Sequence, residues 1–392
     1  MGESPIAHGL DGTLVEPDWP PLTLPELRPV LSCFEGMDER AEILSVSPRP
    51  FSAASVIATG KGRVFVKRHS RLIRTAEALR EEHRFMAHLL DHGVGVPLVL
   101  PTEAGDTVVE DESSIYELHS VPEGVDLYQD AISWTPFLSP EHARSAGEML
   151  ASLHVAAESY EAPARSDRPL VASFTIFASS HAGGAWNRYT QARPALRAYL
   201  SESTIRETAL EVLAPFHEEL LVFIPYLKPL WTHNDLHASN LFWSDGTDKA
   251  RATAVIDFGL CDRTNAVHDL AQAIERNCVE WLALMQNPQY PEGVRIHRDH
   301  LWALLDGYEA ARPLPTDERA AIAPMLALCH AEFALSEADY FLTALHSEEK
   351  ARVACEDYLV GHAKWWRGAG AAMLDEVRAW AAGSHLRKAG RA

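Results

Sequence analysis

Polar side chains that could hold a metal ion or move a proton are concentrated in one short stretch, WTHNDLHASNLFW, at residues 231–243. Large apolar residues surround them, so the polar groups would lie inside a hydrophobic frame. Such a stretch suits a metal site, a catalytic loop or a polar turn between two strands. Five polar residues fall within eight positions: His233, Asn234, Asp235, His237 and Asn240.

A zinc site is the first alternative, because His233 and His237 are four residues apart, as in the H-E-x-x-H zinc helix. The residues between them are Asn, Asp and Leu, so no glutamate base follows the first histidine. The surrounding residues also lack a helical pattern. The sequence therefore disfavours zinc here.

A longer pattern is more specific. His233, Asp235 and Asn240 form H-x-D-x-x-x-x-N over residues 233–240, and seventeen residues after Asn240 a strand-like segment ends in Asp-Phe-Gly at 257–259. In order and spacing, these motifs resemble the catalytic loop and the D-F-G motif of the protein-kinase fold. The match predicts phosphoryl transfer from ATP.

The residue types fit that chemistry. Mg²⁺ prefers oxygen ligands, which the carboxylate of Asp257 and the side-chain carbonyl of Asn240 would provide. Asp235 is predicted to orient the acceptor hydroxyl and take its proton. His233 is predicted to hold the loop in place rather than carry a proton, and His237 to have a packing or surface role.

ATP phosphates also need a cation, which Lys67 is predicted to supply from the end of the strand-like segment RVFVKRH. Glu81 and Glu82 follow on a predicted helix, and Glu82 lies nearer its apolar face, so Glu82 is predicted to pair with Lys67. The preceding turn, PRPFSAAS, has no glycine. Backbone N–H groups with Ser52 and Ser55 are therefore expected to bind phosphate.

Two groups of elements would position these residues. Residues 41–121 predict strand, strand, helix, strand, strand, which suits a small antiparallel sheet with one main helix. Residues 122–392 have mainly helical patterns and contain the loop 233–240 and the metal-binding motif 257–259. Residues 1–40, rich in proline and acidic groups, form an N-terminal extension that either packs against another part or stays loose. The expected fold class is α+β, with a bilobal, protein-kinase-like arrangement.

Composition limits the partners. A chain of 392 residues is long enough for two lobes. Its net charge of -20 argues against nucleic acid as a partner. The longest apolar run, residues 220–225, is too short to cross a membrane. The N-terminus lacks the pattern of a secretory signal, and five scattered cysteines fit a reducing compartment, so a cytoplasmic location is expected. The oligomeric state stays open.

The motifs together resemble the aminoglycoside phosphotransferase and choline-kinase-like family, whose catalytic loop is similar to H-G-D-x-H-x-x-N followed by I-D-F or I-D-W. This chain has HNDLHASN at residues 233–240 and VIDFG at 255–259. HDLA at 268–271 resembles the family's D-L-A, whose aspartate, here Asp269, braces the catalytic region. Asn234 stands where the family usually has glycine, and asparagine tolerates unusual backbone angles.

The resemblance spans roughly residues 50–345, and its later helices are most similar to homoserine-kinase-like and stress-response-kinase-like members. It implies an enzyme that uses ATP and Mg²⁺ to phosphorylate a hydroxyl group of a small molecule. Acidic residues on the later helices would suit an amine-bearing acceptor, such as an amino alcohol, a hydroxy amino acid or an aminoglycoside, or they form a solvated face. They are Glu275, Glu280, Glu332, Glu337 and Asp339.

Two other functions are weighed. A protein Ser/Thr kinase of the same family is the alternative, although only nine residues separate Gly259 from Asp269 and no A-P-E follows. A non-catalytic nucleotide-binding scaffold is disfavoured, because such a protein should have lost one of the residues needed for transfer. All four are present: Lys67, Asp235, Asn240 and Asp257.

Overall fold

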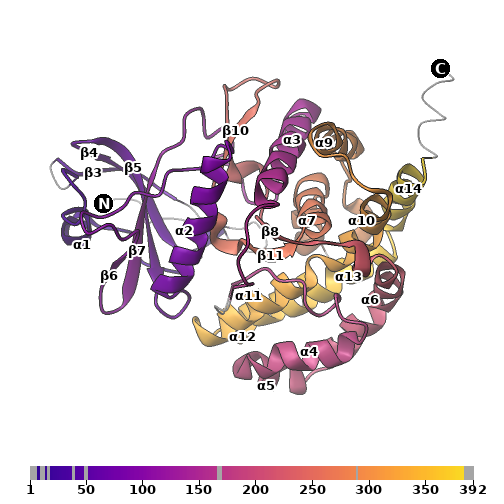
Figure 1. The fold of residues 1–392 in the computed structure, drawn as a ribbon. Coiled ribbons are helices and arrows are strands. Elements are labelled where there is room, and N and C mark those ends of the chain that lie inside the picture. The colour runs from indigo at the N-terminus through magenta and orange to yellow at the C-terminus, as the bar shows by residue number, and fades with distance from the viewer. Residues whose placement is uncertain are drawn as a thin grey trace.

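A computed structural model gives the fold (Figure 1). A lobe built on an antiparallel sheet lies beside a larger, mainly helical lobe, which confirms the predicted α+β, kinase-like arrangement. Parts of the predicted N-terminal extension, residues 48–51 of the predicted phosphate turn and the tail from residue 384 lie outside the described residues. The structure describes residues 7–8, 14–15, 18–37, 40–47, 52–165, 170–287 and 290–383.

The sheet of the smaller lobe has the strand order β3-β4-β5-β7-β6, and all neighbouring strands are antiparallel. A tight turn joins β4 to β5 where the glycine-rich sequence predicts one, and Gly62 there has a φ of 115°. The strands are β3 (Glu42–Val46), β4 (Ala53–Thr59), β5 (Gly62–Ser70), β6 (Val109–Glu110) and β7 (Ser114–Ser120). A separate pair is formed by β1 (Ala7–His8) and β2 (Leu14–Val15).

The two faces of this sheet meet different partners, because side chains alternate along each strand. One face packs against α1 (Leu24–Leu31), where Leu27 and Leu31 share a hydrophobic core with Ile57 and Val66. Of the two alternatives for the N-terminal extension, its described residues therefore follow the packed one. Figure 1 shows α1 and α2 on opposite sides of the sheet.

Helix α2 (Ala76–Asp91) lies between the sheet and the helical lobe (Figure 1). Thr75 caps its start by accepting a hydrogen bond from the Ala78 N–H, and Gly93, with a φ of 81°, follows its end. Three of its side chains belong to the core of the helical lobe: Phe85, Met86 and Leu89. The helix therefore joins the two lobes through a shared core.

The helical lobe surrounds α7, in which every residue is buried. No helix among the described residues has the length and apolar character needed to span a membrane. The helices are α3 (Pro140–Ala157), α4 (Ala182–Gln191), α5 (Pro194–Ser201), α6 (Ile205–Leu221), α7 (Ala266–Cys278), α8 (Trp281–Gln286), α9 (Arg298–Ala311), α10 (Thr316–Leu328), α11 (Ala331–Thr343), α12 (Glu348–Arg352), α13 (His362–Arg367) and α14 (Ala371–Ala381), with a π-helix at Val353–Gly361.

Two pairs of antiparallel strands hold the predicted catalytic segments. They are β8 (Pro229–Thr232) with β11 (Asp262–Asn265), and β9 (Leu241–Trp243) with β10 (Ala252–Val255). The first segment runs from β8 into β9 and the second from β10 into β11, so the two lie side by side. The Ile256 N–H donates a 2.9 Å hydrogen bond to the Asn240 carbonyl and ties them together.

Candidate active site

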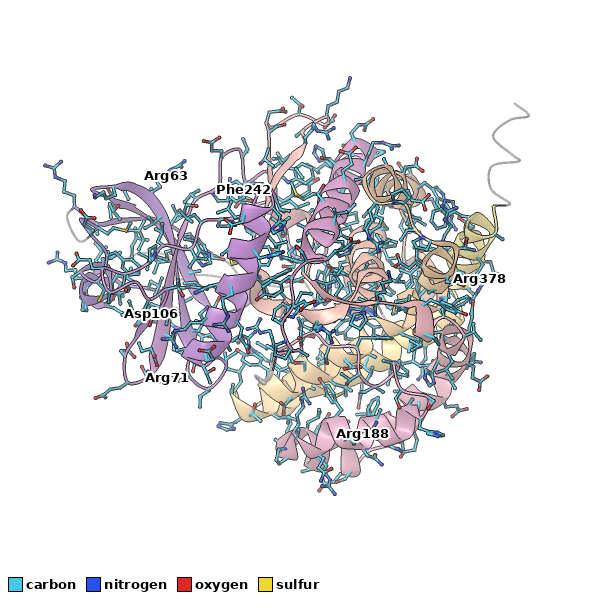
Figure 2. The ribbon with its side chains drawn as sticks, in the orientation of Figure 1. Arg63, Arg71, Asp106, Arg188, Phe242 and Arg378 are labelled. Carbon is cyan, nitrogen blue, oxygen red and sulfur yellow. The ribbon has the colours of Figure 1, made fainter. Side chains whose placement is uncertain are left out.

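A cavity of about 390 Å³ lies between the lobes. Lys67 and Glu82 line it from the smaller lobe, and Asn240 and Asp257 line it from the helical lobe. Phe242, labelled in Figure 2, is part of its apolar wall. Exposed side chains such as Arg188 lie far from it at the edge of the molecule (Figure 2). Residues predicted to handle ATP and its metal ion therefore share one cavity.

His233 links the catalytic loop to the Asp-Phe-Gly segment. Its ring is buried, its Nε2 lies 3.0 Å from the Ile256 carbonyl oxygen, and it packs edge-on against Phe258 with ring centroids 4.9 Å apart. His237 is also buried, with its Nδ1 2.9 Å from the Ser239 hydroxyl. Both histidines therefore make contacts that hold the loop in place.

Asp269, in the first turn of α7, holds the same loop by hydrogen bonds to its backbone. One of its carboxylate oxygens accepts hydrogen bonds from the His233 N–H (2.9 Å) and His154 Nε2 (2.9 Å), and the other accepts from the Asn234 N–H (2.8 Å). Burial alone would raise the pKa of Asp269, but these donors hold that pKa below its ordinary value. The carboxylate is therefore an anion bound to the loop backbone.

Asn234 adopts the left-handed conformation that explains the family's usual glycine. Its φ is 60°, and its side chain is fully buried. The side-chain oxygen accepts hydrogen bonds from the Thr232 and Thr264 hydroxyls at 3.0 Å, and its Nδ2 donates to the Leu260 carbonyl at 3.2 Å. The asparagine keeps the backbone shape and adds side-chain bonds between the two catalytic segments.

Replacing Asn234 by Gly and by Ala should separate these two contributions. Both variants lose the side-chain hydrogen bonds, but only alanine is strained at a φ of 60°. We expect the free energy of unfolding of the alanine variant to be about 1 kcal/mol lower than that of the glycine variant. Urea unfolding measures this difference, and equal stabilities would contradict the role given to the backbone angle.

Asp235 is held through both of its carboxylate oxygens. Asn240 Nδ2 donates to the Asp235 carbonyl at 3.0 Å and to its Oδ2 at 3.2 Å, while Arg276 donates to Oδ1. Asn240 lines the cavity, and because its Nδ2 donates to Asp235, the side-chain oxygen is its other polar side-chain atom. That is the atom a metal ion would bind.

Arg276 was not predicted from the sequence. This fully buried α7 residue also donates to the Asn234 carbonyl at 3.1 Å, and its guanidinium lies 4.9 Å from the Phe333 ring centroid and 5.4 Å from that of Trp134. Burial alone would lower its pKa, but the Asp235 carboxylate raises it. Its position seven residues, or two helical turns, after Asp269 was the available signal, because both then face the loop.

Replacing Arg276 by Met should lower turnover by about tenfold to a hundredfold through loss of the charge that holds Asp235. The KM for ATP should change little, because the arginine does not line the nucleotide cavity. Without the guanidinium, Asp235 gains a proton more readily, so the acidic limb of the turnover profile should move to higher pH. Arg276→Lys should restore part of the rate, and an unchanged pH profile would contradict this role.

Lys67 pairs with Asp257 rather than with Glu82. Its Nζ lies 2.9 Å from Asp257 Oδ1. Burial would raise the pKa of Asp257, but the Lys67 ammonium holds it well below its ordinary value. Asp257 itself has a φ of 59°, in the left-handed region. The pair places an ionised carboxylate and a cation on the cavity wall.

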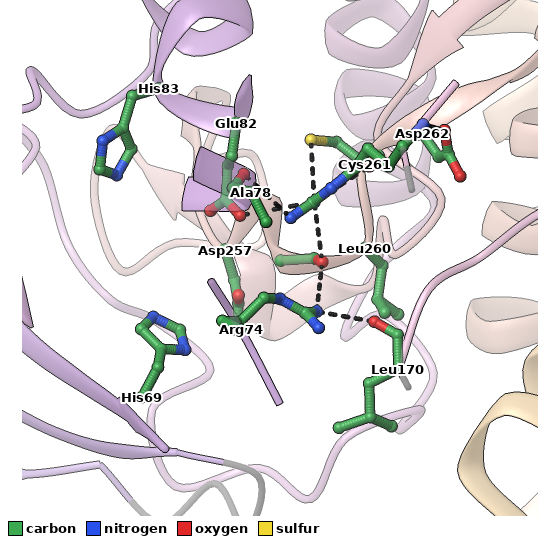
Figure 3. Close-up of polar contacts among 12 residues, drawn as sticks. His69, Arg74, Ala78, Glu82, His83, Leu170, Asp257, Leu260, Cys261 and Asp262 are labelled. Carbon is green, nitrogen blue, oxygen red and sulfur yellow. Dashed lines mark hydrogen bonds and ion pairs between the residues drawn. The ribbon is translucent and has the colours of Figure 1, made fainter. Parts of the chain in front are cut away.

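Glu82 instead forms an ion pair with Arg165 at 3.5 Å, so the predicted Lys67–Glu82 pair is absent from the described conformation. Figure 3 shows Glu82 facing the Asp257 segment, with Arg74 reaching the Leu170 carbonyl. Arg74 also donates to the Gly259 carbonyl at 2.9 Å. Arg165 lies outside any helix or strand, and for this reason no periodic pattern revealed it.

The two predicted phosphate-binding serines lie differently. Ser52 lines the cavity, as the prediction requires. Ser55 lies opposite Val66 in the sheet register, on the face that packs against α1, and it is 1% exposed. The prediction for Ser55 is therefore wrong, because alternation along β4 points its hydroxyl away from the nucleotide side.

The five acidic residues for which an amine pocket and a solvated face were the alternatives do not form an open pocket. Glu332 accepts hydrogen bonds from the Thr175 and Ile176 N–H groups, and Glu275 lies 3.1 Å from His362. Glu280 pairs with Arg295 at 2.8 Å, and Asp339 lies 3.7 Å from Arg193. Burial raises the pKa of Glu337 to about 8. Most of these carboxylates are therefore already paired with groups of the protein itself.

Comparison with known proteins places this site in context. A model of the phosphotransferase enzyme family matches residues 51–314, more than half of the chain. No curated protein sequence matches significantly. The solved structure of a microcompartment-associated aminopropanol kinase is similar with a TM-score of 0.59 and 19% identity, covering 88% of this chain and 98% of that one.

Two further solved structures share the fold. An aminoglycoside phosphotransferase from Alicyclobacillus acidocaldarius has a TM-score of 0.52 and 16% identity, covering 93% of this chain and 98% of that one. An amicoumacin kinase in complex with AMP-PNP, Ca²⁺ and Ami has a TM-score of 0.56 and 13% identity, covering 86% of this chain and 92% of that one. At these identities the likeness is one of fold.

Proposed function

Because the chain belongs to the phosphotransferase enzyme family, we propose that it uses ATP and Mg²⁺ to phosphorylate a hydroxyl group of a small molecule. One observation carries the proposal: Lys67, Asn240 and Asp257 line a single cavity, and Asp235 is hydrogen-bonded to Asn240 beside it. A cation, two oxygen donors and a carboxylate base are the groups that this transfer requires.

The residues present fit a magnesium ion. Asp257 offers an ionised carboxylate and Asn240 an amide oxygen, and both are hard oxygen donors of the kind Mg²⁺ prefers. When bound, the ion would neutralise charge on the phosphates during transfer. The amicoumacin kinase complex with AMP-PNP and Ca²⁺ supports nucleotide and divalent-metal use in this fold.

Asp235 would act on the acceptor. The acceptor oxygen forms a bond to the γ-phosphorus, the bond from that phosphorus to the bridging oxygen of ADP breaks, and the hydroxyl proton passes to Asp235. The side chain of Asp235 is 17% exposed, so an acceptor can reach it, while Arg276 and Asn240 fix its direction. Lys67 would hold the phosphates from the opposite wall.

A small molecule is favoured over a protein as acceptor. β11 follows the Asp-Phe-Gly segment directly and pairs with β8, and α7 begins at Ala266. The segment between Asp-Phe-Gly and α7 is therefore short. Protein kinases use a longer segment there to hold a peptide. The fold relatives named as kinases of aminopropanol and amicoumacin also support a small acceptor.

The test is an ATP-consumption screen with purified protein. The acceptors are amino alcohols, hydroxy amino acids, sugars, aminoglycosides and a generic protein substrate, each with and without Mg²⁺. We expect ADP release that needs both Mg²⁺ and a small hydroxyl compound. Acceptor-dependent turnover only with the protein substrate would overturn the choice of a small molecule.

A further inference from the structure

Three histidines and a glutamate form a buried cluster behind Lys67 that the proposed phosphoryl transfer does not use. They come from three elements of the smaller lobe: His69 on β5, His83 on α2, and Glu117 and His119 on β7. Each is at most 8% exposed. Figure 3 labels His83 and His69, which come from the helix and a strand of the smaller lobe.

The imidazole nitrogens converge on one carboxylate. His83 Nε2 lies 2.6 Å and His119 Nε2 lies 3.1 Å from the same oxygen of Glu117, Oε2. One ligand atom each from His83, Glu117 and His119 fall within 4.8 Å of one another. Zinc bonds of about 2.0–2.2 Å in tetrahedral geometry place the ligand atoms about 3.4 Å apart, so these atoms would separate by about 1 Å or less to admit the ion.

A second layer of contacts fixes these three groups. The Thr107 hydroxyl lies 2.8 Å from His83 Nδ1, so Nε2 is the nitrogen turned toward the carboxylate. His69 Nε2 lies 2.8 Å from the other oxygen of Glu117, Oε1, and leaves Oε2 to the other two histidines. Ligands of protein metal sites are commonly oriented by hydrogen bonds of this kind.

The same contacts would also suit a network in which imidazole N–H groups stabilise a buried carboxylate. Two features favour a metal ion. The first is that two imidazole nitrogens and one carboxylate oxygen meet at one point, and this is a donor set that zinc binds. Glu117 and His119 also line the nucleotide cavity, so a water molecule can enter from that side as the remaining ligand.

We propose that His83, Glu117 and His119 bind a divalent transition metal ion of the Zn²⁺ type, at a site separate from the magnesium ligands Asn240 and Asp257. The ion would join α2 to β7. Because Glu82 precedes His83 on α2, metal binding would fix the position of Glu82 in the cavity wall. This inference concerns metal affinity and stands independently of the proposed function.

The test uses the full chain without an affinity tag, stripped with chelator and dialysed against Zn²⁺ or Co²⁺. We expect about one bound ion per chain by elemental analysis, a visible Co²⁺ spectrum typical of nitrogen and oxygen ligands, and a rise in Tm of about 5 °C at a hundredfold excess over Kd. No ATP or acceptor is present, so failure of catalysis cannot affect the result.

Variants locate the ion. His83→Gln and His119→Gln should each lower metal affinity at least tenfold, whereas Asp257→Ala should leave the bound ion in place. His297→Gln is the matched control, because His297, Asp299 and His300 form the other histidine and carboxylate group found among the described residues. A wild-type chain that retains no Zn²⁺ or Co²⁺, or an ion lost only in His297→Gln, would overturn the proposal even if a cluster variant fails to fold.

Discussion

Asp235→Asn is expected to lower turnover by about 10² to 10⁴-fold while leaving the affinity for Mg²⁺ and ATP nearly unchanged. The substitution preserves the size of the side chain but removes the negative charge that takes the acceptor's proton. It also leaves the Arg276 guanidinium facing a neutral amide. Steady-state rates with the acceptor found in the screen, and calorimetric titration with nucleotide, measure the two effects separately.

The control for this variant is Asp245→Asn, in the exposed β9–β10 turn. That change also removes a negative charge, but in a turn that strand β9 separates from the loop at 233–240, and we expect wild-type turnover. Full turnover in Asp235→Asn would remove the base from the mechanism. A parallel loss of nucleotide binding would show that Asp235 holds the site together rather than acting on the acceptor.

Asp257→Ala should abolish Mg²⁺-dependent binding of ATP. Asp257 is the ionised carboxylate on the cavity wall, and its removal also leaves Lys67 without the partner 2.9 Å away. Since Asp257 would hold the Mg²⁺ that neutralises charge on the phosphates, neither Mg²⁺ nor ATP should bind well without this carboxylate. Calorimetric titration of ATP with and without Mg²⁺ measures the loss.

Asp257→Asn is the informative companion, because it keeps one oxygen donor and the shape of the side chain. We expect weakened rather than abolished Mg²⁺-dependent binding. Normal affinity of Asp257→Ala for Mg²⁺ and ATP would count against Asp257 as the metal ligand, whatever its effect on turnover.

The loop at 233–240 and the Asp-Phe-Gly segment could be identified because the residues that suggest their chemistry lie close together in the sequence. Asp235, Asn240 and Asp257 occur at a characteristic spacing, and the two antiparallel strand pairs that flank them bring the segments together. The two-lobed fold followed from strand and helix patterns. Membership of the family confirms the resemblance drawn from those motifs.

Contacts between distant segments could not be predicted in the same way. Glu82 was assigned to Lys67 from its helical position, but it pairs with Arg165, which lies 83 residues later in the sequence. The prediction for Ser55 was wrong for a local reason, since a one-residue step along a strand moves a side chain to the other face of the sheet. Which face of β4 meets the nucleotide depends on where α1 packs.

Buried charges were the other source of error. The acidic residues of α7 and α11 resembled a solvated face or an amine pocket, yet the structure gives Glu275 a histidine partner and Glu332 two backbone donors. Arg276 belongs to the same class, because a charged residue in a buried helix is stabilised only by partners that sequence alone does not place.

The fate of the γ-phosphate of ATP tests the central claim most directly. Wild-type protein is incubated with Mg²⁺, γ-labelled ATP and the acceptor panel, and the label is followed by mass spectrometry, with Asp235→Asn in parallel. The account predicts one phosphate on a small-molecule hydroxyl for each ADP formed, and a strong loss of that product in the variant. Label found only on protein or only as free phosphate, at rates equal in wild type and variant, would contradict it.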